Sequence, residues 1–492
     1  MNLSTLRQDI PAGLVVFLVA LPLCLGIAQA SGLPPFVGLL TGVIGGLVVT
    51  TFSPSKFAVS GPAAGLVTIV TGAIETLGSF SALLLALIIA GVLQFLLGVA
   101  RAGRFITLVP GTVIKGMLAA IGILLIIQQI PVALGASGEN ELSAMVTGGA
   151  FTVSVSAIVV SMTGLFILWF WSTPTVKRIK VLSWIPGPLV AVLFGCLVTV
   201  VGGRMFPELI ASLPRISLPS FDSLQALTGE LERPDWTAWQ NPAVYMIAAT
   251  LAIVASLETL LSQEALKKLR PQNPAPSPDK EMRAQGIGNL ISGFLGGLPI
   301  TAVIVRSSVN VSVGAQSKIS ILVHGVLLLV CGLYFSEMLN AIPLASLAAV
   351  LLHTGYKLAT PGLFVEHIRK GAQQYVPFLA TIGGILVFGM LAGIGIGLAT
   401  QILFSIYKSH RNALLLTRYD DHYVLRFQQN LTFMHNPRLK GLLAEIPENS
   451  VVIVEHDNAE YIDPDVKAVL QDFGESAVKR GIVLNQWPVQ LA

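Results

Sequence analysis

Residues 288–310 read GNLISGFLGGLPITAVIVRSSVN and combine closely spaced glycines, one proline and one arginine within otherwise apolar sequence. Burying an arginine in hydrocarbon costs at least about 2.5–3.5 kcal/mol, so Arg306 indicates a functional site by default. The glycines and Pro299 predict an interrupted helix, and irregular backbone at membrane depth is tolerated only where it faces protein or a cavity. The stretch therefore predicts one half of a binding site for a small anion.

The overall composition is that of a polytopic membrane protein. Charged residues make up 11% of 492 residues and hydrophobic residues 53%, and the mean hydropathy is +0.76, whereas roughly a quarter of the residues in soluble domains are charged. Cys24, Cys196 and Cys331 lie in separate apolar runs, so neither a disulfide framework nor a zinc site is indicated. No nucleophile, metal cluster or phosphate loop indicates an enzyme, and no nucleic acid partner is expected.

Apolar segments long enough to cross the hydrocarbon core recur along the chain and predict about fourteen membrane spans. The long segments fall near residues 10–30, 35–51, 81–100, 109–130, 152–172, 184–203, 243–263, 317–335 and 374–391. Shorter or glycine-broken segments fall near 61–77, 284–298, 305–316, 341–355 and 393–408. We therefore expect a polytopic α-helical membrane protein.

Basic residues predict the orientation, because Lys and Arg concentrate in cytoplasmic loops. With the N-terminus in the cytoplasm, most basic residues fall on the cytoplasmic side, including Lys267, Lys268 and Arg270. The opposite side receives only Arg204, Arg215 and Arg233, all in or beside the loop 204–241. We expect a multi-pass protein of a bacterial inner (plasma) membrane with both termini in the cytoplasm.

An internal repeat is visible in the glycine-rich segments. Gly38–Leu47, GLLTGVIGGL, aligns without gaps to Asn289–Leu298, NLISGFLGGL. The copies belong to the second and the ninth predicted spans, so the repeat unit is seven spans and must be inverted. Glycine-rich helices also resemble one another by chance. The repeat predicts two halves, at about 1–203 and 242–411, with a substrate site between them near the membrane midplane.

Each copy is followed by an interrupted segment that predicts a half-helix. A short extended piece, Phe57–Ser60 or Ile300–Ile304, would lead into a helix whose first N–H groups have no intrahelical partner. Two such helix starts can direct their N–H groups and positive dipole ends at one anion. We expect Pro62 in the first turn of one half-helix and Arg306 in the first turn of the other. The alternative is a simple kink at Gly61-Pro62 and an Arg306 side chain that snorkels to the surface.

These residues carry a family resemblance. The run 288–310, together with LPLCLGIAQASGLPPFVGLL at 21–40 and VSGPAAGL at 59–66, resembles the SulP anion transporters, the solute carrier 26 family. The resemblance extends over nearly the whole chain. It implies fourteen spans in a 7+7 inverted repeat with core and gate domains, a homodimer, and a substrate held between the third and tenth spans. By that match, the substrate-binding residues are Pro22, Cys24, Ser60, Gly61, Ala63, Val305 and Arg306. Leu23 stands where many relatives carry glutamine, which argues against sulfate-type coordination.

Glu258 and Ser262 lie four residues apart in the eighth span and share a helix face. Glu258 could be a structural counter-ion of Arg306, or it could carry a coupling ion. As an oxygen ligand alongside Ser262 and Thr301 it could hold sodium, and as a buried acid it could carry a proton. In family members that co-transport a cation, an acidic residue at this place does that work, so the resemblance supports coupling without choosing Na+ or H+. No other cofactor is expected, and we expect His324 to be a satisfied core histidine.

The composition becomes that of a soluble domain from about Lys408, which predicts a transmembrane domain at 1–411 and a cytoplasmic domain at 412–492. Strands are expected at Val424–Gln428 and Val451–Glu455. A helix is expected to begin at Asp463-Pro464, with aspartate as its cap and proline in its first turn. The order of strands and helix resembles a short STAS domain, the cytoplasmic tail of SulP transporters.

The function indicated first is secondary active transport of a small inorganic anion by alternating access. Residues 13–30 and 110–135 resemble the prokaryotic SulP subgroup fused to or encoded beside carbonic anhydrases, which implies bicarbonate and a functional association with a carbonic anhydrase. Sulfate and dicarboxylates are the alternatives within the family. A nucleobase-type permease of the same fold and an anion channel are further alternatives; Arg306 and residues 420–492 argue against the permease.

Overall fold

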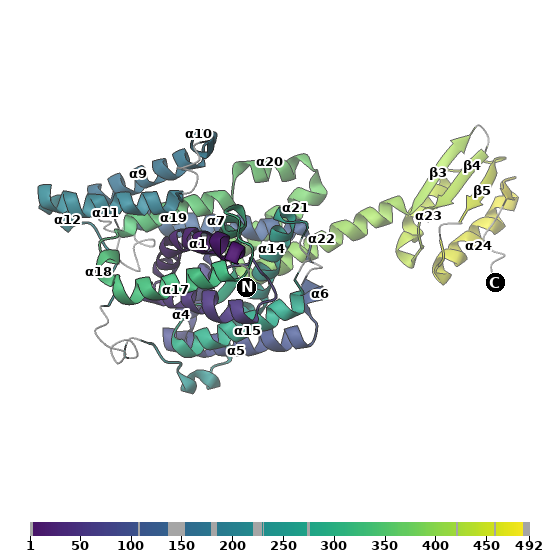
Figure 1. Cartoon of the computed structure of the whole chain (residues 1–492). Helices are drawn as coiled ribbons and strands as arrows, with labels where there is room; N and C mark the ends of the chain where they lie inside the picture. The colour runs from purple at the N-terminus through teal and green to yellow at the C-terminus, as the bar shows by residue number, and fades with distance from the viewer. Residues whose placement is uncertain are drawn as a thin grey trace. The chain divides into compact units, whose positions relative to one another are not determined.

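The computed structural model describes residues 3–106, 109–135, 153–178, 185–219, 229, 231–272, 276–419, 422–456 and 459–485. The chain forms two compact units, Met1–Gly397 and Leu398–Ala492 (Figure 1). The division falls within helix α22 (Met390–Asn412), which also contains the predicted domain boundary after residue 411.

In its described residues, the regular structure of the first unit is helical apart from one short two-stranded sheet. Its principal helices are α1 (Leu3–Ala30), α2 (Pro35–Ile44), α4 (Val67–Leu77), α5 (Phe80–Val99), α7 (Gly111–Ala133), α9 (Val155–Ser172), α11 (Gly187–Met205), α14 (Pro242–Leu269), α15 (Pro278–Leu295), α16 (Ile304–Ser312), α17 (Ile319–Tyr334), α19 (Leu344–Leu358) and α21 (Ala372–Phe388). The shorter helices are α3 (Thr50–Phe52), α6 (Gly103–Ile106), α10 (Pro174–Arg178), α12 (Pro207–Ala211), α18 (Ser336–Leu339) and α20 (Pro361–Arg369).

Eight helices within the described ranges are long and apolar enough to cross a membrane. This agrees with the prediction of a polytopic membrane protein, while the count of fourteen spans and their division into seven plus seven stay predictions. Three length assignments were wrong. The segment 393–408 belongs to the long helix α22, whereas α17 and α21 are only 16 and 17 residues long. α21 is short because Gly389, with a φ of 86°, ends that helix at Phe388.

Small residues allow the central helices to pack closely. α15 packs along α5, and a Cβ atom at Gly91 or Gly286 would overlap the backbone of the facing helix. α1 packs against α2, α17 and α19, and its side chains from Val19 to Ala28 form part of the largest apolar cluster. The glycine-rich composition of these segments therefore reflects helices that touch through their backbones.

The two copies of the glycine repeat begin alike and end differently. After α2, the chain continues through a π-helical turn, Gly45–Val49, into α3. In the second copy, α15 ends at Leu295, and Gly296 follows with a φ of 79°. Both copies then lead into three-residue strands, β1 (Ser60–Pro62) and β2 (Ile300–Ala302).

The second unit contains a four-stranded sheet in the order β3-β4-β5-β6. The strands are β3 (Leu414–Tyr419), β4 (His422–Phe427), β5 (Val451–Glu455) and β6 (Val483–Asn485). β3 and β4 are antiparallel, and β4, β5 and β6 are parallel. Besides the end of α22, the second unit contains the helices α23 (Asn436–Ala444) and α24 (Pro464–Lys479).

The amphipathic helix predicted for this unit is confirmed as α24. The Asp463 carboxylate accepts a hydrogen bond from the Asp465 N–H at 3.0 Å and caps the helix. Val466, Leu470 and Phe473 are buried against the sheet, as their helical spacing predicts.

Candidate functional site

The two interrupted segments meet as an antiparallel pair of strands. Ser60 lies opposite Ala302, and Gly61 lies opposite Thr301. After β1 the chain enters a 3-10 turn at Ala64–Leu66 and then α4, and after β2 it enters α16 at Ile304. Two short helices therefore begin beside one two-stranded sheet.

The expected position of Pro62 was wrong. Pro62 is the last residue of β1, opposite Ile300, and the helical turn begins only at Ala64. A proline lacks an N–H group and is tolerated where a strand ends. The pairing of the strands also excludes the interpretation of Gly61-Pro62 as a simple kink in a continuous helix.

Side chains from neighbouring helices hold β2 in place. Asn289 of α15 accepts a hydrogen bond from the Ile300 N–H at 2.6 Å and donates one to the Ile300 carbonyl at 3.1 Å. Thr259 of α14 accepts a hydrogen bond from the Ala302 N–H at 3.1 Å. Because three-residue strands have few ladder bonds of their own, these side chains complete their backbone pairing.

Arg306 lies in the first turn of α16, as predicted, and its side chain is fully buried, which excludes snorkelling. Its Nη2 donates a hydrogen bond to the Pro62 carbonyl at 2.9 Å. Its Nε and Nη1 have no hydrogen-bond partner in the described part of the chain. A Cβ atom at Gly61 would overlap Nη1, so any larger residue there would displace the guanidinium from this position. A buried cation with two unpaired donors is suited to hold an anion.

The first helix brings Cys24 to the same guanidinium. Cys24 is fully buried in α1, and its thiol lies within interaction range of the Arg306 guanidinium. Gly42 of α2 provides space for the thiol, because a Cβ atom there would lie 2.8 Å from the sulfur. Pro22 is buried in the same helix, two residues before Cys24.

The remaining predicted substrate residues lie on the two half-helix segments. Ser60 and Ala63 are buried, and Ala63 is the extended residue that precedes the 3-10 turn. Val305 is half-buried in the first turn of α16, beside Arg306 in sequence. The structure thus places Ser60, Gly61, Ala63, Val305 and Arg306 on the paired segments, with Cys24 facing them from α1.

A buried polar chain behind Ser60 was not found from the sequence. Gln285 Nε2 donates to Ser60 Oγ at 2.8 Å and to Glu281 Oε1 at 3.0 Å. Ser53 Oγ donates to Glu281 Oε2 at 2.6 Å. Because Ser60 Oγ accepts a hydrogen bond from Gln285, its own proton stays available to a ligand. The spacing of Glu281, Gln285 and Asn289 at four-residue intervals is the signal that could have revealed this face of α15.

Glu258 lies at the start of the other half-helix and not beside Arg306. A Cβ atom at Gly65, in the turn before α4, would lie 3.0 Å from both Glu258 carboxylate oxygens. No ion pair joins Glu258 to Arg306, both of which the structure describes. A carboxylate is favoured at a helix N-terminus, so the geometry does not support the counter-ion interpretation.

Two of the three candidate coupling residues offer unpaired oxygen atoms to a hard cation. Within the described residues, Glu258 Oε2 and Thr301 Oγ1 are buried oxygens without a hydrogen-bond partner. Ser262 is buried one turn after Glu258 in α14. Carboxylate and hydroxyl oxygens are the ligands that hard cations prefer. The described residues contain no cluster of three His, Cys, Asp or Glu side chains that could hold a metal ion.

His324 is not a satisfied core histidine, so that expectation was wrong. It is fully buried in α17, and neither ring nitrogen has a hydrogen-bond partner among the described residues. Its ring lies near Gly46 and within electrostatic range of Arg306. The residue stood alone on an apolar helix, and only the packing of α17 against α2 shows what it faces.

The sequence is similar to a known protein family and to several known proteins. Residues 6–381 match the model of the sulfate permease family. A putative sulfate transporter of Bacillus subtilis, YvdB, is 31% identical over 414 residues, which cover 83% of this chain and 75% of that protein. The bicarbonate transporter BicA of Picosynechococcus is 28% identical over 373 residues, which cover 72% of this chain and 62% of that protein.

Two solved structures share the fold. The transmembrane domain of a cyanobacterial bicarbonate transporter BicA matches with a TM-score of 0.68 at 23% identity, covering 82% of this chain and 98% of that chain. The inward-facing structure of the murine anion transporter Slc26a9 matches with a TM-score of 0.76 at 15% identity, covering 98% of this chain and 86% of that chain.

Proposed function

The chain belongs to the sulfate permease family, and from this premise we propose that it is a secondary transporter whose first substrate is bicarbonate. Family membership makes it a multi-pass membrane transporter of anions and not an enzyme. The observation that supports an anion site is Arg306, a fully buried guanidinium with two unpaired donors beside the paired strands.

Three groups would hold the anion. The Arg306 guanidinium supplies a permanent charge and charge-assisted hydrogen bonds, which are the strong ones. Ser60 offers a hydroxyl proton whose orientation is set by the bond from Gln285. The backbone at the starts of α4 and α16 adds the positive ends of two helix dipoles. Alternating access would then expose this fixed site to each side of the membrane in turn.

The choice of bicarbonate rests on similarity and on one residue. The chain is similar to BicA proteins, which are named as bicarbonate transporters, and Leu23 removes the glutamine expected for sulfate coordination. The similarity to YvdB, named as a putative sulfate transporter, favours sulfate. Sulfate and dicarboxylates therefore stay as the alternative substrates of the same site.

Cation coupling is part of the proposal. Glu258 Oε2 and Thr301 Oγ1 are buried and unpaired, which suits either a sodium ion held with Ser262 or a proton on Glu258. The distribution of basic residues supports cytoplasmic termini in a bacterial inner membrane. The family resemblance further suggests a homodimer and an association with a carbonic anhydrase.

The test is uptake of labelled bicarbonate, sulfate and fumarate by the purified protein in proteoliposomes, with sodium and proton gradients imposed separately. We expect saturable bicarbonate uptake that one of the two gradients drives. If only sulfate or only fumarate is taken up in a saturable way, that anion is the substrate and bicarbonate is not. Flux that neither saturates nor responds to a cation gradient would contradict the proposal of a carrier and would indicate a channel.

A further inference from the structure

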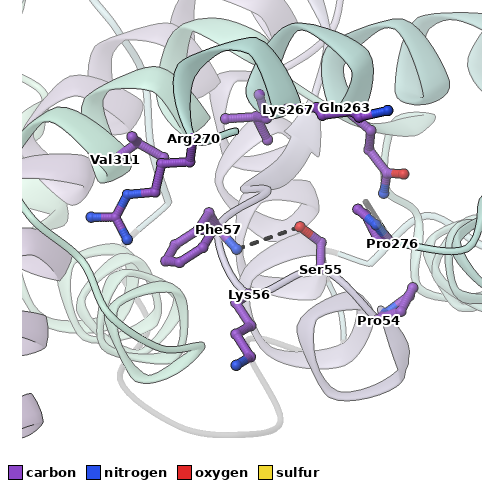
Figure 2. A pocket seen from close by; sticks show the side chains of 10 residues that line it. Pro54, Ser55, Lys56, Phe57, Gln263, Lys267, Arg270, Pro276 and Val311 are labelled. Carbon is purple, nitrogen blue, oxygen red and sulfur yellow. Dashed lines mark hydrogen bonds between the residues drawn. The ribbon is translucent and has the colours of Figure 1, made fainter. Parts of the chain in front are cut away.

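A second pocket lies where the chain approaches β1 and where α14 ends. Its polar lining consists of Ser55, Lys56, Gln263, Lys267 and Arg270, with Phe57 on one side. Figure 2 shows these side chains around the pocket. None of the candidate substrate residues lines it, so it is distinct from the Arg306 site.

The pocket is strongly basic. Lys56, Lys267 and Arg270 contribute three positive charges, and no acidic residue lines it. None of the three forms an ion pair with an acidic residue in the ranges that the structure describes. The dipole of α14 favours Lys267 in its last turn and Arg270 at its C-cap, whereas Lys56 lies outside this helix. Three uncompensated cations around one cavity attract an anion.

Contacts within the chain hold Arg270, Phe57 and Ser55 of the lining in place. The Arg270 guanidinium lies 4.7 Å from the centroid of the Phe57 ring, a cation–π contact that holds it at the pocket. Phe57 is itself held by Asn310 of α16, whose side chain donates to the Phe57 carbonyl at 3.1 Å. Ser55 Oγ accepts hydrogen bonds from the Phe57 and Ala58 N–H groups at 3.4 and 3.1 Å and stabilises the turn.

Gln263 contributes a buried amide to the lining. Its side chain is 6% exposed, and Nε2 has no hydrogen-bond partner among the described residues, although the amide also lies near the Glu281 carboxylate. An anion in the pocket would offer Nε2 an acceptor in addition to the Glu281 carboxylate.

We propose that this pocket binds a phosphate group, either as inorganic phosphate or as the phosphomonoester headgroup of a lipid. A phosphate carries nearly two negative charges and several acceptor oxygens, which matches three cations and a buried amide better than a singly charged anion does. The bound group would tie the approach to β1 to the end of α14. Since β1 and α14 carry Ser60 and Glu258, the site lies on the elements of the transport site without sharing its residues.

The first test is thermal unfolding of the full-length protein in lipid-free detergent, with inorganic phosphate titrated against chloride at equal ionic strength. A ligand that binds only the folded state raises the unfolding midpoint in a saturable way. We expect the Lys267→Gln/Arg270→Gln variant to need roughly tenfold more phosphate, or more, for the same shift. Lys268→Gln is the matched control, because Lys268 is exposed in the same helix turn and does not line the pocket. If the double variant fails to fold, the exposed pair Lys56→Gln/Lys267→Gln replaces it.

The second test identifies the source of the phosphate. The protein is placed in nanodiscs of phosphatidylcholine alone or with phosphatidic acid. A shift with inorganic phosphate supports a soluble ligand, and a shift only with phosphatidic acid supports a lipid headgroup. The response should persist in saturating bicarbonate and in Arg306→Ala, which separates it from transport. No shift with either probe would overturn the proposal. Equal shifts in Lys267→Gln/Arg270→Gln and in Lys268→Gln would also overturn it, as would a shift that only Arg306→Ala removes.

Discussion

Replacing Gly61 by alanine should weaken anion binding without unfolding the protein. The new methyl group would occupy the space now filled by Arg306 Nη1, so the guanidinium must move. The movement would break or strain the hydrogen bond from Nη2 to the Pro62 carbonyl, now 2.9 Å long. The perturbation therefore acts on the position of the charge and leaves the charge itself in place.

The size of the effect follows from that bond. A hydrogen bond to a charged group contributes about 1.5–3 kcal/mol, and overpacking a filled interior costs about 1–3 kcal/mol. If the guanidinium loses its anchor and the cost falls on binding, the concentration for half-maximal uptake should rise roughly 10- to 150-fold. The unfolding midpoint should change less, because Arg306 can retreat into the space of the absent anion.

The assay is initial-rate uptake of labelled bicarbonate into proteoliposomes as a function of its concentration. Gly383→Ala is the matched control, since Gly383 is an exposed glycine within α21 and a Cβ atom there meets no atom within 4 Å. The control should behave as wild type. Wild-type half-saturation and rate in Gly61→Ala would refute the placement of the anion at Nη1.

Three further substitutions test the surroundings of the site. Glu258→Gln should retain anion exchange and lose the response to sodium or proton gradients in the same uptake assay; unchanged coupling would make Glu258 structural. Asn289→Ala should lower stability by about 2 kcal/mol or more, because it leaves the Ile300 N–H and carbonyl buried without partners; an unchanged thermal unfolding midpoint would contradict this. Gln285→Leu removes the donor to Ser60, so half-saturation should rise roughly fivefold, as expected for about 1 kcal/mol; an unaltered value would separate the Ser60 hydroxyl from binding.

The central residues of the site could be predicted because they depart from the usual apolar composition of membrane spans. An arginine among glycines in a membrane segment is rare, and the repeat of the glycine helix directed attention to Gly61 as its mate. Helix α24 was equally predictable, because its cap and its apolar spacing are local signals. Except for the repeat, whose copies lie far apart in the chain, these signals are local in the sequence.

Other features depend on contacts that no local pattern reveals. β1 and β2 have three residues each, too few to show an alternating period, so their pairing and the strand position of Pro62 were missed. Glu281 was missed because the apolar part of α15 begins after it, which made it resemble a loop residue. His324 was misjudged because the satisfaction of a buried histidine depends on which helix faces it.

The most direct measurement is saturable uptake of labelled bicarbonate by Arg306→Ala in proteoliposomes, with a thermal unfolding midpoint measured on the same preparation. This substitution removes the buried guanidinium and its two unpaired donors. We predict that a folded Arg306→Ala protein shows no saturable uptake above empty liposomes. Saturable uptake at the wild-type rate and half-saturation would contradict the assignment of Arg306 to the anion site.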